Sequence, residues 1–228
     1  MAAPVFDAQG LSAYQGNIQN SLTLTWTHVV GTNPNNYGLV TIFEGNGGNA
    51  DLMPSSVTSS SVSIGSTTLS SLGYVLMNNS QADGFIWVFG APNCPTGSQT
   101  VTMTLNFSGI FWVWGYGYST TYTGVGSVGS LQTAYGSGTA NSVTVPSASG
   151  HLVYGAMENY STDTYSGLSF TARETQTSNQ PYFIAGDMAG TSSTSFSATL
   201  SGSLPWGAVG LDLQPVSAPT NQFFSMFR

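Results

Sequence analysis

Residues 22–30 read LTLTWTHVV, and their alternating pattern predicts the fold class of the chain. Alternate side chains of a β-strand point to opposite faces. One face of this stretch would be mostly threonine, and the other would carry Leu22, Leu24, Trp26, His28 and Val30. The pattern therefore predicts a strand with one buried, apolar face. Because His28 lies on that face, we predict a buried histidine that hydrogen-bonds to a backbone carbonyl; a catalytic or metal-binding role is the alternative.

The same texture continues along all 228 residues. Short runs of aliphatic, aromatic and threonine residues alternate with turn-forming clusters, namely NPNN, PNCPTG, YGSGTA, PSASG and SGSLPWG. This alternation is typical of all-β proteins, and no window shows the period of a helix. We therefore predict an all-β fold, an antiparallel two-sheet β-sandwich of jelly-roll (Greek-key) type.

Two hairpins resemble each other weakly. SLTLTWTHVV followed by YGLVTIFEG resembles NSVTVPSASG followed by HLVYGAMEN. Each is a Thr/Val-rich strand, a turn and a second strand of apolar and small residues. Paired hairpins are common in Greek-key sandwiches, and the sequence shows no solenoid period.

The strongest apolar segment is QTVTMTLNFSGIFWVWGYGYS, residues 99–119. QTVTMTLNF alternates apolar and polar residues, which predicts a one-sided strand. GIFWVWGYGYS is predicted as a second strand, in which Phe111, Trp112 and Trp114 belong to a run without alternation. Such a run is typical of a central strand covered on both faces or of a patch covered on oligomerisation, and the sequence leaves both open.

The charge content excludes several classes of partner. Only 5% of the residues are charged, the net charge is −7, and the chain has no lysine. Nucleic-acid binding needs many Lys and Arg side chains, and so does binding to anionic lipid. The apolar runs are too short for a membrane-spanning helix. Burying a surface of hydroxyls and amides removes few charges from water, so the composition favours a repeated component of an assembly.

Few residues could support catalysis. His28 and His151 are the only histidines, and no cluster with zinc-ligand spacing includes them. A triad at His28 would need a serine and an aspartate supplied by the fold. Cys94 is alone, so no internal disulfide forms, and it is predicted to be a small apolar loop residue. The acidic residues show no glycosidase-like pair. We predict no enzymatic activity, no cofactor and no metal.

Three short motifs have structural interpretations. Residues 124–129, GVGSVG, match the GxGxxG spacing, but no helix pattern or acidic residue follows, so we predict a glycine-rich loop. Residues 158–163, ENYSTD, contain oxygen ligands suitable for calcium but lack the pattern of a loop site. Arg173 and Glu174 are predicted to make surface contacts at a strand edge.

The C-terminal segment differs from the rest of the chain. Pro215 and Pro219 are incompatible with a continuing central strand, and an apolar tail follows them. We predict a sandwich domain over residues 1–216 and an apolar arm over residues 217–228, which docks on its own domain or on a neighbouring subunit. The candidate interface residues are Phe111, Trp112, Trp114, Phe223, Phe224 and Phe227.

Framework segments along most of the chain resemble a known family: VFDAQG, SLTLTWTHVVGTN, GSQTVTMTLNFSG, NSVTVPSASGHLVYGAM and WGAVGLDLQPVSAPTNQFF. Read together, they resemble the minor tail proteins of actinobacteriophages (mycobacteriophage-like). The resemblance implies a β-sandwich without catalytic chemistry in a virion tail. It supplies no functional residue, and His151 stands where many relatives have aspartate.

The expected partners are copies of the chain, other virion proteins and a host-surface glycan. The alternatives are a capsid decoration protein, a carbohydrate-binding module and a hydrolase. The N-terminal residues MAAPVFDAQG lack a basic segment followed by an apolar run, so assembly in the host cytoplasm is expected.

Overall fold

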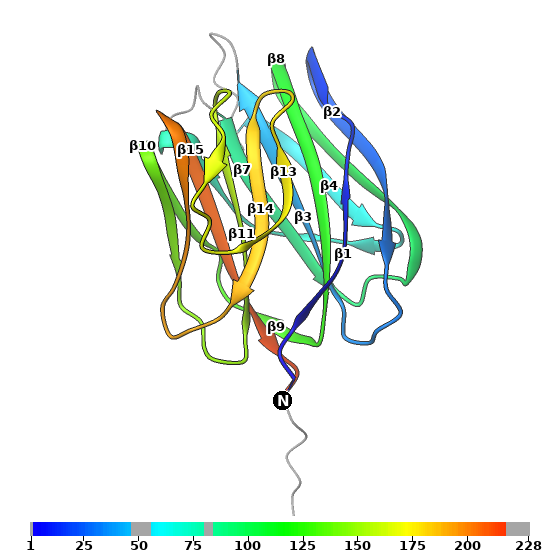
Figure 1. Cartoon of the computed structure of the whole chain (residues 1–228). Coiled ribbons are helices and arrows are strands. Elements are labelled where there is room, and N and C mark those ends of the chain that lie inside the picture. The colour runs from blue at the N-terminus through cyan, green and yellow to red at the C-terminus, as the bar shows by residue number, and fades with distance from the viewer. Residues whose placement is uncertain (1, 47–55, 80–83, 218–228) are drawn as a thin grey trace, which may run out of the picture.

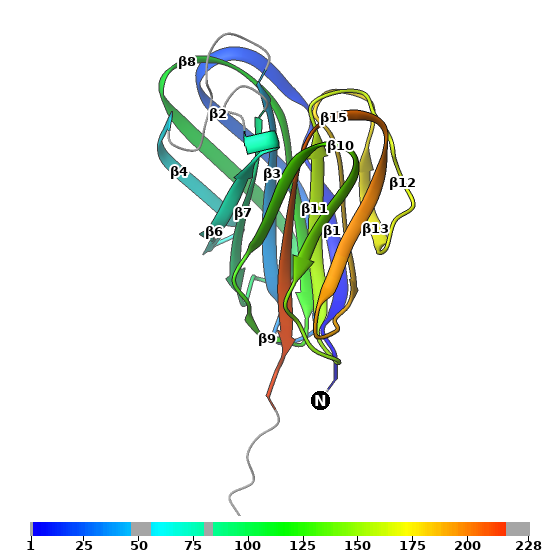
Figure 2. The same ribbon diagram turned by 90° about the vertical axis from the view of Figure 1, so that its left-hand side faces the viewer.

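The computed structural model describes residues 2–46, 56–79 and 84–217, which form two antiparallel β-sheets packed face to face, as predicted (Figures 1 and 2). Sheet A contains β1 (Val5–Leu11), β2 (Gln15–Val30), β3 (Tyr37–Asn46), β4 (Val57–Ile64), β5 (Thr67–Thr68), β6 (Ser70–Leu76), β7 (Gly84–Pro92) and β8 (Gly97–Thr123). A short 3₁₀ helix, η2 (Met77–Asn79), follows β6. Sheet B contains β9 (Val125–Val128), β10 (Gln132–Val145), β11 (Leu152–Asn159), β12 (Tyr165–Ser166), β13 (Thr171–Gln176), β14 (Tyr182–Ala189) and β15 (Thr194–Pro215).

The two sheets share one topology. In sheet A, β8 pairs with β1, β2, β3 and β4, and β3 leads on to β7 and β6. In sheet B, β15 pairs with β9, β10, β11 and β12, and β11 leads on to β14 and β13. The matching strands follow the same order along the chain, and β5 is the one described strand without a counterpart. The chain therefore contains an internal repeat: repeat 1 covers residues 5–123 and repeat 2 covers residues 125–215.

The strand registers support the repeat. Leu39 of β3 faces Thr120 of β8, and Leu152 of β11 faces Leu213 of β15. Leu39 and Leu152 are each the first residue of an LV dipeptide. The register shifts before Ser21 in the β2–β8 pair and before Ala140 in the β10–β15 pair. Ser21 faces Asn106 and Ala140 faces Thr199. Asn106 precedes Thr120 by the same number of residues as Thr199 precedes Leu213. The two hairpins noted in the sequence are β2–β3 and β10–β11, so their resemblance reflects equivalent structure.

Two segment boundaries predicted from glycine and proline are wrong. QTVTMTLNF and GIFWVWGYGYS form the single strand β8, and the predicted turn SGSLPWG lies inside the single strand β15. The predicted turns YGSGTA and SGSLPWG pair with each other, since Gly136 faces Trp206 and Ser137 faces Pro205. Pairing between β10 and β15 continues through both segments. Their glycine and proline residues therefore shift the register of this pair and do not end either strand.

The long strands each contribute to two layers. The first half of β8, with β2 and β4, lies on the outer face of β3 and β7, so Leu24 and Met103 share a core with Ile42 and Phe89. Repeat 2 does the same: Val143 of β10 and Phe196 of β15 share a core with Met157 of β11 and Ile184 of β14. The molecule thus has one core inside each repeat and a third core between the sheets.

The core between the sheets is largely aromatic. Phe43 and Phe183 stack with ring centroids 3.8 Å apart. The hydroxyls of Thr41 and Tyr154, which follow the equivalent LV dipeptides by one residue, hydrogen-bond across the gap at 2.6 Å. The two repeats therefore meet through equivalent positions. The jelly-roll wiring is not confirmed, because each sheet takes all of its strands from one half of the chain.

Over the described residues, no helix has the length and apolar character needed to cross a membrane.

Candidate functional site

His28 is fully buried, with 0% of its surface exposed, and its face of β2 is apolar as predicted. Its partners differ from the prediction. Nδ1 lies 2.9 Å from the Ser119 hydroxyl and Nε2 lies 3.0 Å from the Thr121 hydroxyl, both on β8. The expected bond to a backbone carbonyl is thus replaced by two side-chain hydroxyls. No sequence pattern indicated these partners, because they are far away along the chain.

The His28 contacts form a continuous hydrogen-bond chain. Trp26 Nε1 donates to Ser119 at 2.9 Å, and Thr121 donates to Asp7 Oδ2 at 2.8 Å. Since the Thr121 hydroxyl donates its hydrogen bond to Asp7, its oxygen accepts a hydrogen bond from Nε2–H of His28. Nδ1 of neutral His28 then accepts from Ser119. The neutral Nε2–H tautomer satisfies every group from Trp26 to Asp7.

Burial holds His28 in this neutral form. Desolvation lowers the pKa of His28 from 6.5 to about 4, while the negative charge of Asp7 acts in the opposite direction. When His28 is protonated, Nδ1 becomes a donor, and the Ser119 hydroxyl can turn to the Gly10 carbonyl, 3.2 Å away. The network ties β1 to β2 and β8. A hydrolase centred on His28 would need an open cleft, and this ring has no exposed surface.

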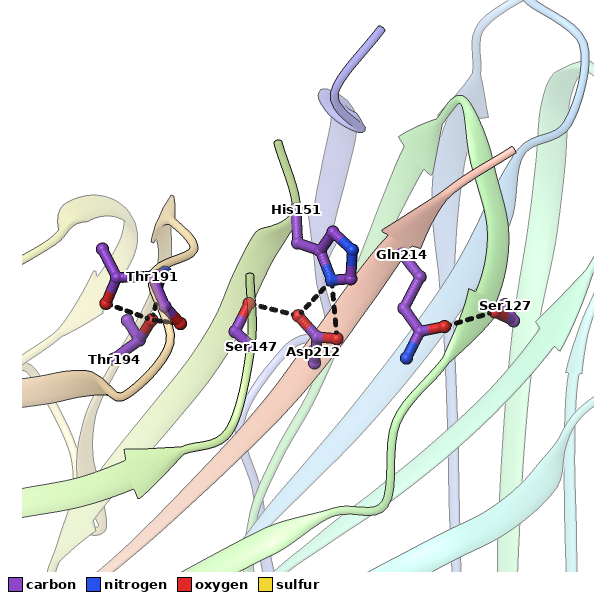
Figure 3. A network of polar contacts seen from close by, with 7 residues as sticks. All are labelled: Ser127, Ser147, His151, Thr191, Thr194, Asp212 and Gln214. Carbon is purple, nitrogen blue, oxygen red and sulfur yellow. Dashed lines mark hydrogen bonds and ion pairs between the residues drawn. The ribbon is translucent and has the colours of Figure 1, made fainter. Parts of the chain in front are cut away.

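A second polar cluster lies in repeat 2 and was not singled out by the sequence (Figure 3). Asp212 of β15 accepts hydrogen bonds from Ser147 and from Nδ1 of His151, the latter at 2.9 Å. The two residues precede β11, and the side chain of His151 is 22% exposed while that of Asp212 is 6% exposed. Ser127 and Gln214 form a neighbouring hydrogen bond of 2.8 Å.

The second cluster occupies the same place in its repeat as the His28 network. Ser119 and Asp212 are the residues immediately before the equivalent Thr120 and Leu213. Trp26 faces Val101 in the β2–β8 pair, and Val145 faces Thr194 in the β10–β15 pair. Both positions lie the same number of residues beyond the register shift. His28 and Ser147 lie two residues beyond Trp26 and Val145. The His28–Ser119 pair of repeat 1 therefore corresponds to the Ser147–Asp212 pair of repeat 2.

The chemistry available to this cluster is limited by its connectivity. A carboxylate that orients a histidine is one half of a nucleophile-activating arrangement. The other half is a hydroxyl bonded to the histidine. Here the Ser147 hydroxyl donates to Asp212, so Asp212 is the hub and no serine–histidine bond is present. The arrangement holds the residues after β10 against β15.

Two glutamates are fully buried. Glu44 of β3 accepts a hydrogen bond from the Trp114 backbone N–H at 3.3 Å. Its second oxygen and both oxygens of Glu158 on β11 have no hydrogen-bond partner within the described part of the chain. Burial raises the pKa of both carboxyls well above the usual range, and the charge of Glu44 raises that of Glu158 further. Burial therefore disfavours the ionised form of both side chains.

The residues considered for calcium do not converge on one site. Glu158 is buried, whereas Asp163 accepts a hydrogen bond from the exposed Ser201 hydroxyl at 2.9 Å. Across residues 2–46, 56–79 and 84–217, no three His, Cys, Asp or Glu side chains gather as a metal site would require.

Arg173 lies on the edge strand β13 and is partly exposed, and its contacts reach the adjacent strand and the other sheet. Its Nε and Nη2 donate to the two carboxylate oxygens of Asp187 at 2.7 and 3.0 Å. Its guanidinium also lies 4.2 Å from the ring centroid of Phe6, on β1 of the other sheet. The arginine therefore links the two sheets at one edge of the sandwich. Beside it, Glu174 accepts a hydrogen bond from the exposed amide of Gln9.

Two smaller predictions have opposite outcomes. Cys94 is buried between β7 and β8, as predicted, and burial raises the pKa of its thiol to about 11. The GVGSVG segment is not a loop, because Val125–Val128 forms β9 and pairs with β15. Pairing with Leu213 and Gln214 accounts for the difference.

The predicted interface residues fall largely outside the description of the structure. Phe111 and Trp112 lie within β8, but their side chains are not described. At Trp114 the strand is paired on both sides, with Gly16 of β2 and Gly45 of β3, which confirms the central-strand interpretation for the backbone. Phe223, Phe224 and Phe227 lie outside the described residues, as does nearly all of the predicted arm.

The chain matches no protein-family model, no curated protein sequence and no solved structure.

Proposed function

We propose that the chain is a non-enzymatic structural component of a bacteriophage virion, a minor tail protein present in several copies. The proposal rests on the surface and on the resemblance of the framework segments to phage minor tail proteins. It treats the two histidine clusters as structural, since His28 is closed to substrate and the Ser147 hydroxyl donates its hydrogen bond to Asp212.

The observation that carries the proposal is the uncharged outer face of repeat 1. The polar sides of β4, β8 and β2 lie next to one another in register and, apart from the exposed Val29 near the end of β2, carry hydroxyl and amide side chains without any charge. These residues are Ser59, Ser61, Ser63, Thr100, Thr102, Thr104, Asn106, Ser21, Thr23, Thr25 and Thr27. A neighbouring subunit can cover such a face without removing charges from water. Ordinary soluble proteins carry about five times more charged residues than this chain does.

The proposal is tested by locating the chain in purified virions. An antibody against the chain, detected by gold labelling, should mark the tail, and mass spectrometry of washed particles should find several copies per particle. Labelling of the capsid would favour the decoration-protein alternative. Absence of the chain from particles that are otherwise complete would contradict the proposal.

No specific observation favours the carbohydrate-binding alternative. Sugar stacking needs exposed aromatic rings in a common plane, and the pairs that include an exposed tyrosine are inclined. The rings of Tyr74 and Trp87 meet at 63°, and those of Tyr14 and Tyr116 at 53°. A glycan array probed with the purified chain tests host-surface glycan contact directly.

A further inference from the structure

Strands β2 and β10 are equivalent strands that each have one pairing partner. Within the described residues, β2 pairs only with β8 and β10 only with β15. Both are long, running over Gln15–Val30 and Gln132–Val145. They lie on opposite sides of the molecule in Figure 1. Each therefore presents one edge of backbone N–H and C=O groups without a pairing strand, although the Thr27 carbonyl of β2 lies against Gly10 of β1.

These edges lack most of the usual protection against pairing. Native edge strands are commonly interrupted by lysine, proline, inward-pointing charges or bulges. Neither β2 nor β10 contains a proline or an Asp, Glu, Lys or Arg residue. Each has one register shift, and beyond it the ladder continues without interruption, to Val30 in β2 and to Val145 in β10.

The side chains on the two edges follow the same pattern. In β2, Thr23 and Thr25 are exposed and Leu24 between them is buried. In β10, Ser142 and Thr144 are exposed and Val143 is buried. A strand added beside either edge would thus continue a hydroxyl-bearing outer face and an apolar inner face. The strand that fits this pattern is the equivalent edge of another copy.

We propose that copies of this chain join edge to edge, β2 of one copy pairing with β10 of the next. Backbone hydrogen bonds would supply the affinity, as in β-strand addition. Because the two edges lie on opposite sides, the contact is head-to-tail and repeats into a row or a ring. The inference rests on the proposed multi-copy role and names the surface that serves it.

The test uses the full chain and light scattering over a wide concentration range. Thr23→Lys with Thr25→Lys charges the β2 edge, and Ser142→Lys with Thr144→Lys charges the β10 edge. Ser195→Lys with Thr199→Lys is the matched control, since it adds the same charge beside β10 on β15, a strand that also pairs with β12. Circular dichroism and thermal melting confirm that all variants are folded.

The wild-type mass should rise with concentration, and each edge variant should need at least about tenfold more protein to associate, which corresponds to about 1.4 kcal/mol. The control should stay within about twofold of wild type. An equimolar mixture of the two edge variants should form a dimer, because each retains the edge that the other lacks. A wild type that remains monomeric, or a control that fails as the edge variants do, overturns the proposal.

The outcome is independent of the virion test. A chain that forms rows in solution but is absent from particles would remove the proposed function and leave edge pairing intact. A chain present in tails but monomeric in solution would do the reverse.

Discussion

Repeat 1 places His28 beside Ser119, and repeat 2 places Ser147 beside Asp212 at the matching positions. The backbone ladders around the two pairs agree residue by residue. The access of water differs: His28 is fully buried, whereas the cluster of repeat 2 reaches the surface through His151. Repeat 1 therefore stabilises a neutral ring with hydroxyl partners, and repeat 2 can keep a carboxylate with a histidine as its partner.

The repeated backbone framework therefore determines where a polar side chain lies but not which residue type occupies the position. In each repeat, a polar side chain near the end of β2 or β10 bonds to one on β8 or β15. The partners need only satisfy each other, because a buried polar group without a hydrogen bond is costly. Substitutions that leave a partner unsatisfied should therefore have the largest effects.

The largest expected effect concerns the buried glutamates, which also differ between the repeats. Glu44 accepts the Trp114 N–H, and Glu158 has no partner among the described residues. The pKa of Glu158 is raised above its value of 4.5 in the unfolded chain, so the unfolded state ionises first as the pH rises. Stability is then lost above pH 4.5, by about 1.4 kcal/mol per pH unit while the folded carboxyl stays protonated.

Glu158→Gln removes this ionisation. The variant should become more stable than wild type in urea unfolding as the pH rises above 4.5, and Glu44→Gln should show the same trend more weakly. Parallel pH profiles for wild type and Glu158→Gln would show that Glu158 does not carry the pKa shift.

The second effect is the loss of the His28 ring. His28→Ala leaves a cavity and deprives the hydroxyls of Ser119 and Thr121 of a partner. Cavity and unsatisfied groups together should cost about 4 kcal/mol. Urea unfolding measures the loss, and His28→Gln, which can bond to one hydroxyl, should recover part of it. A cost below about 1 kcal/mol would contradict the network.

These contacts mark the limit of what the sequence could predict. Period-two alternation gave the strand around His28, its buried face and the all-β class, since these depend on neighbouring residues. The partners of His28 depend on the register between β2 and β8, which lie far apart in sequence. The repeat was visible only as a weak echo, because the ladders match while side chains such as His28 and Ser147 differ.

The strand boundaries predicted from glycine and proline were wrong for a related reason. YGSGTA and SGSLPWG contain turn-forming residues, yet each is the other's partner in the β10–β15 pair. Local propensity cannot reveal such mutual pairing. The partners of Arg173 could not be predicted for the same reason, since Asp187 lies on the adjacent strand and Phe6 lies on the opposite sheet.

The third effect is an acid-side loss of stability from repeat 1. The pKa of His28 is about 4 in the folded chain and 6.5 in the unfolded chain, so the unfolded state binds the extra proton first. Stability should fall as the pH drops from 6.5 to about 4, by about 3 kcal/mol in total, and this contribution should be constant outside that window. Urea unfolding at intervals of pH measures the slope, which should be reduced in His28→Gln. An unchanged slope in that variant would assign the loss to other groups.

The smallest effect is expected for His151 in the polar cluster of repeat 2. Its loss of stability can be compared directly with that of His28→Ala in repeat 1. His151→Ala removes a partly exposed ring, so water can replace its hydrogen bond to Asp212, and no cavity is sealed inside a core. Exposed or partly exposed pairs of this kind contribute about 0.5–1 kcal/mol. The two alanine variants delete the same side chain in two repeats that share one framework. If burial explains their difference, His151→Ala should cost several-fold less than His28→Ala in the same urea titration. Equal costs would mean that Asp212 depends on His151 as strongly as Ser119 depends on His28, and that access of water does not distinguish the repeats.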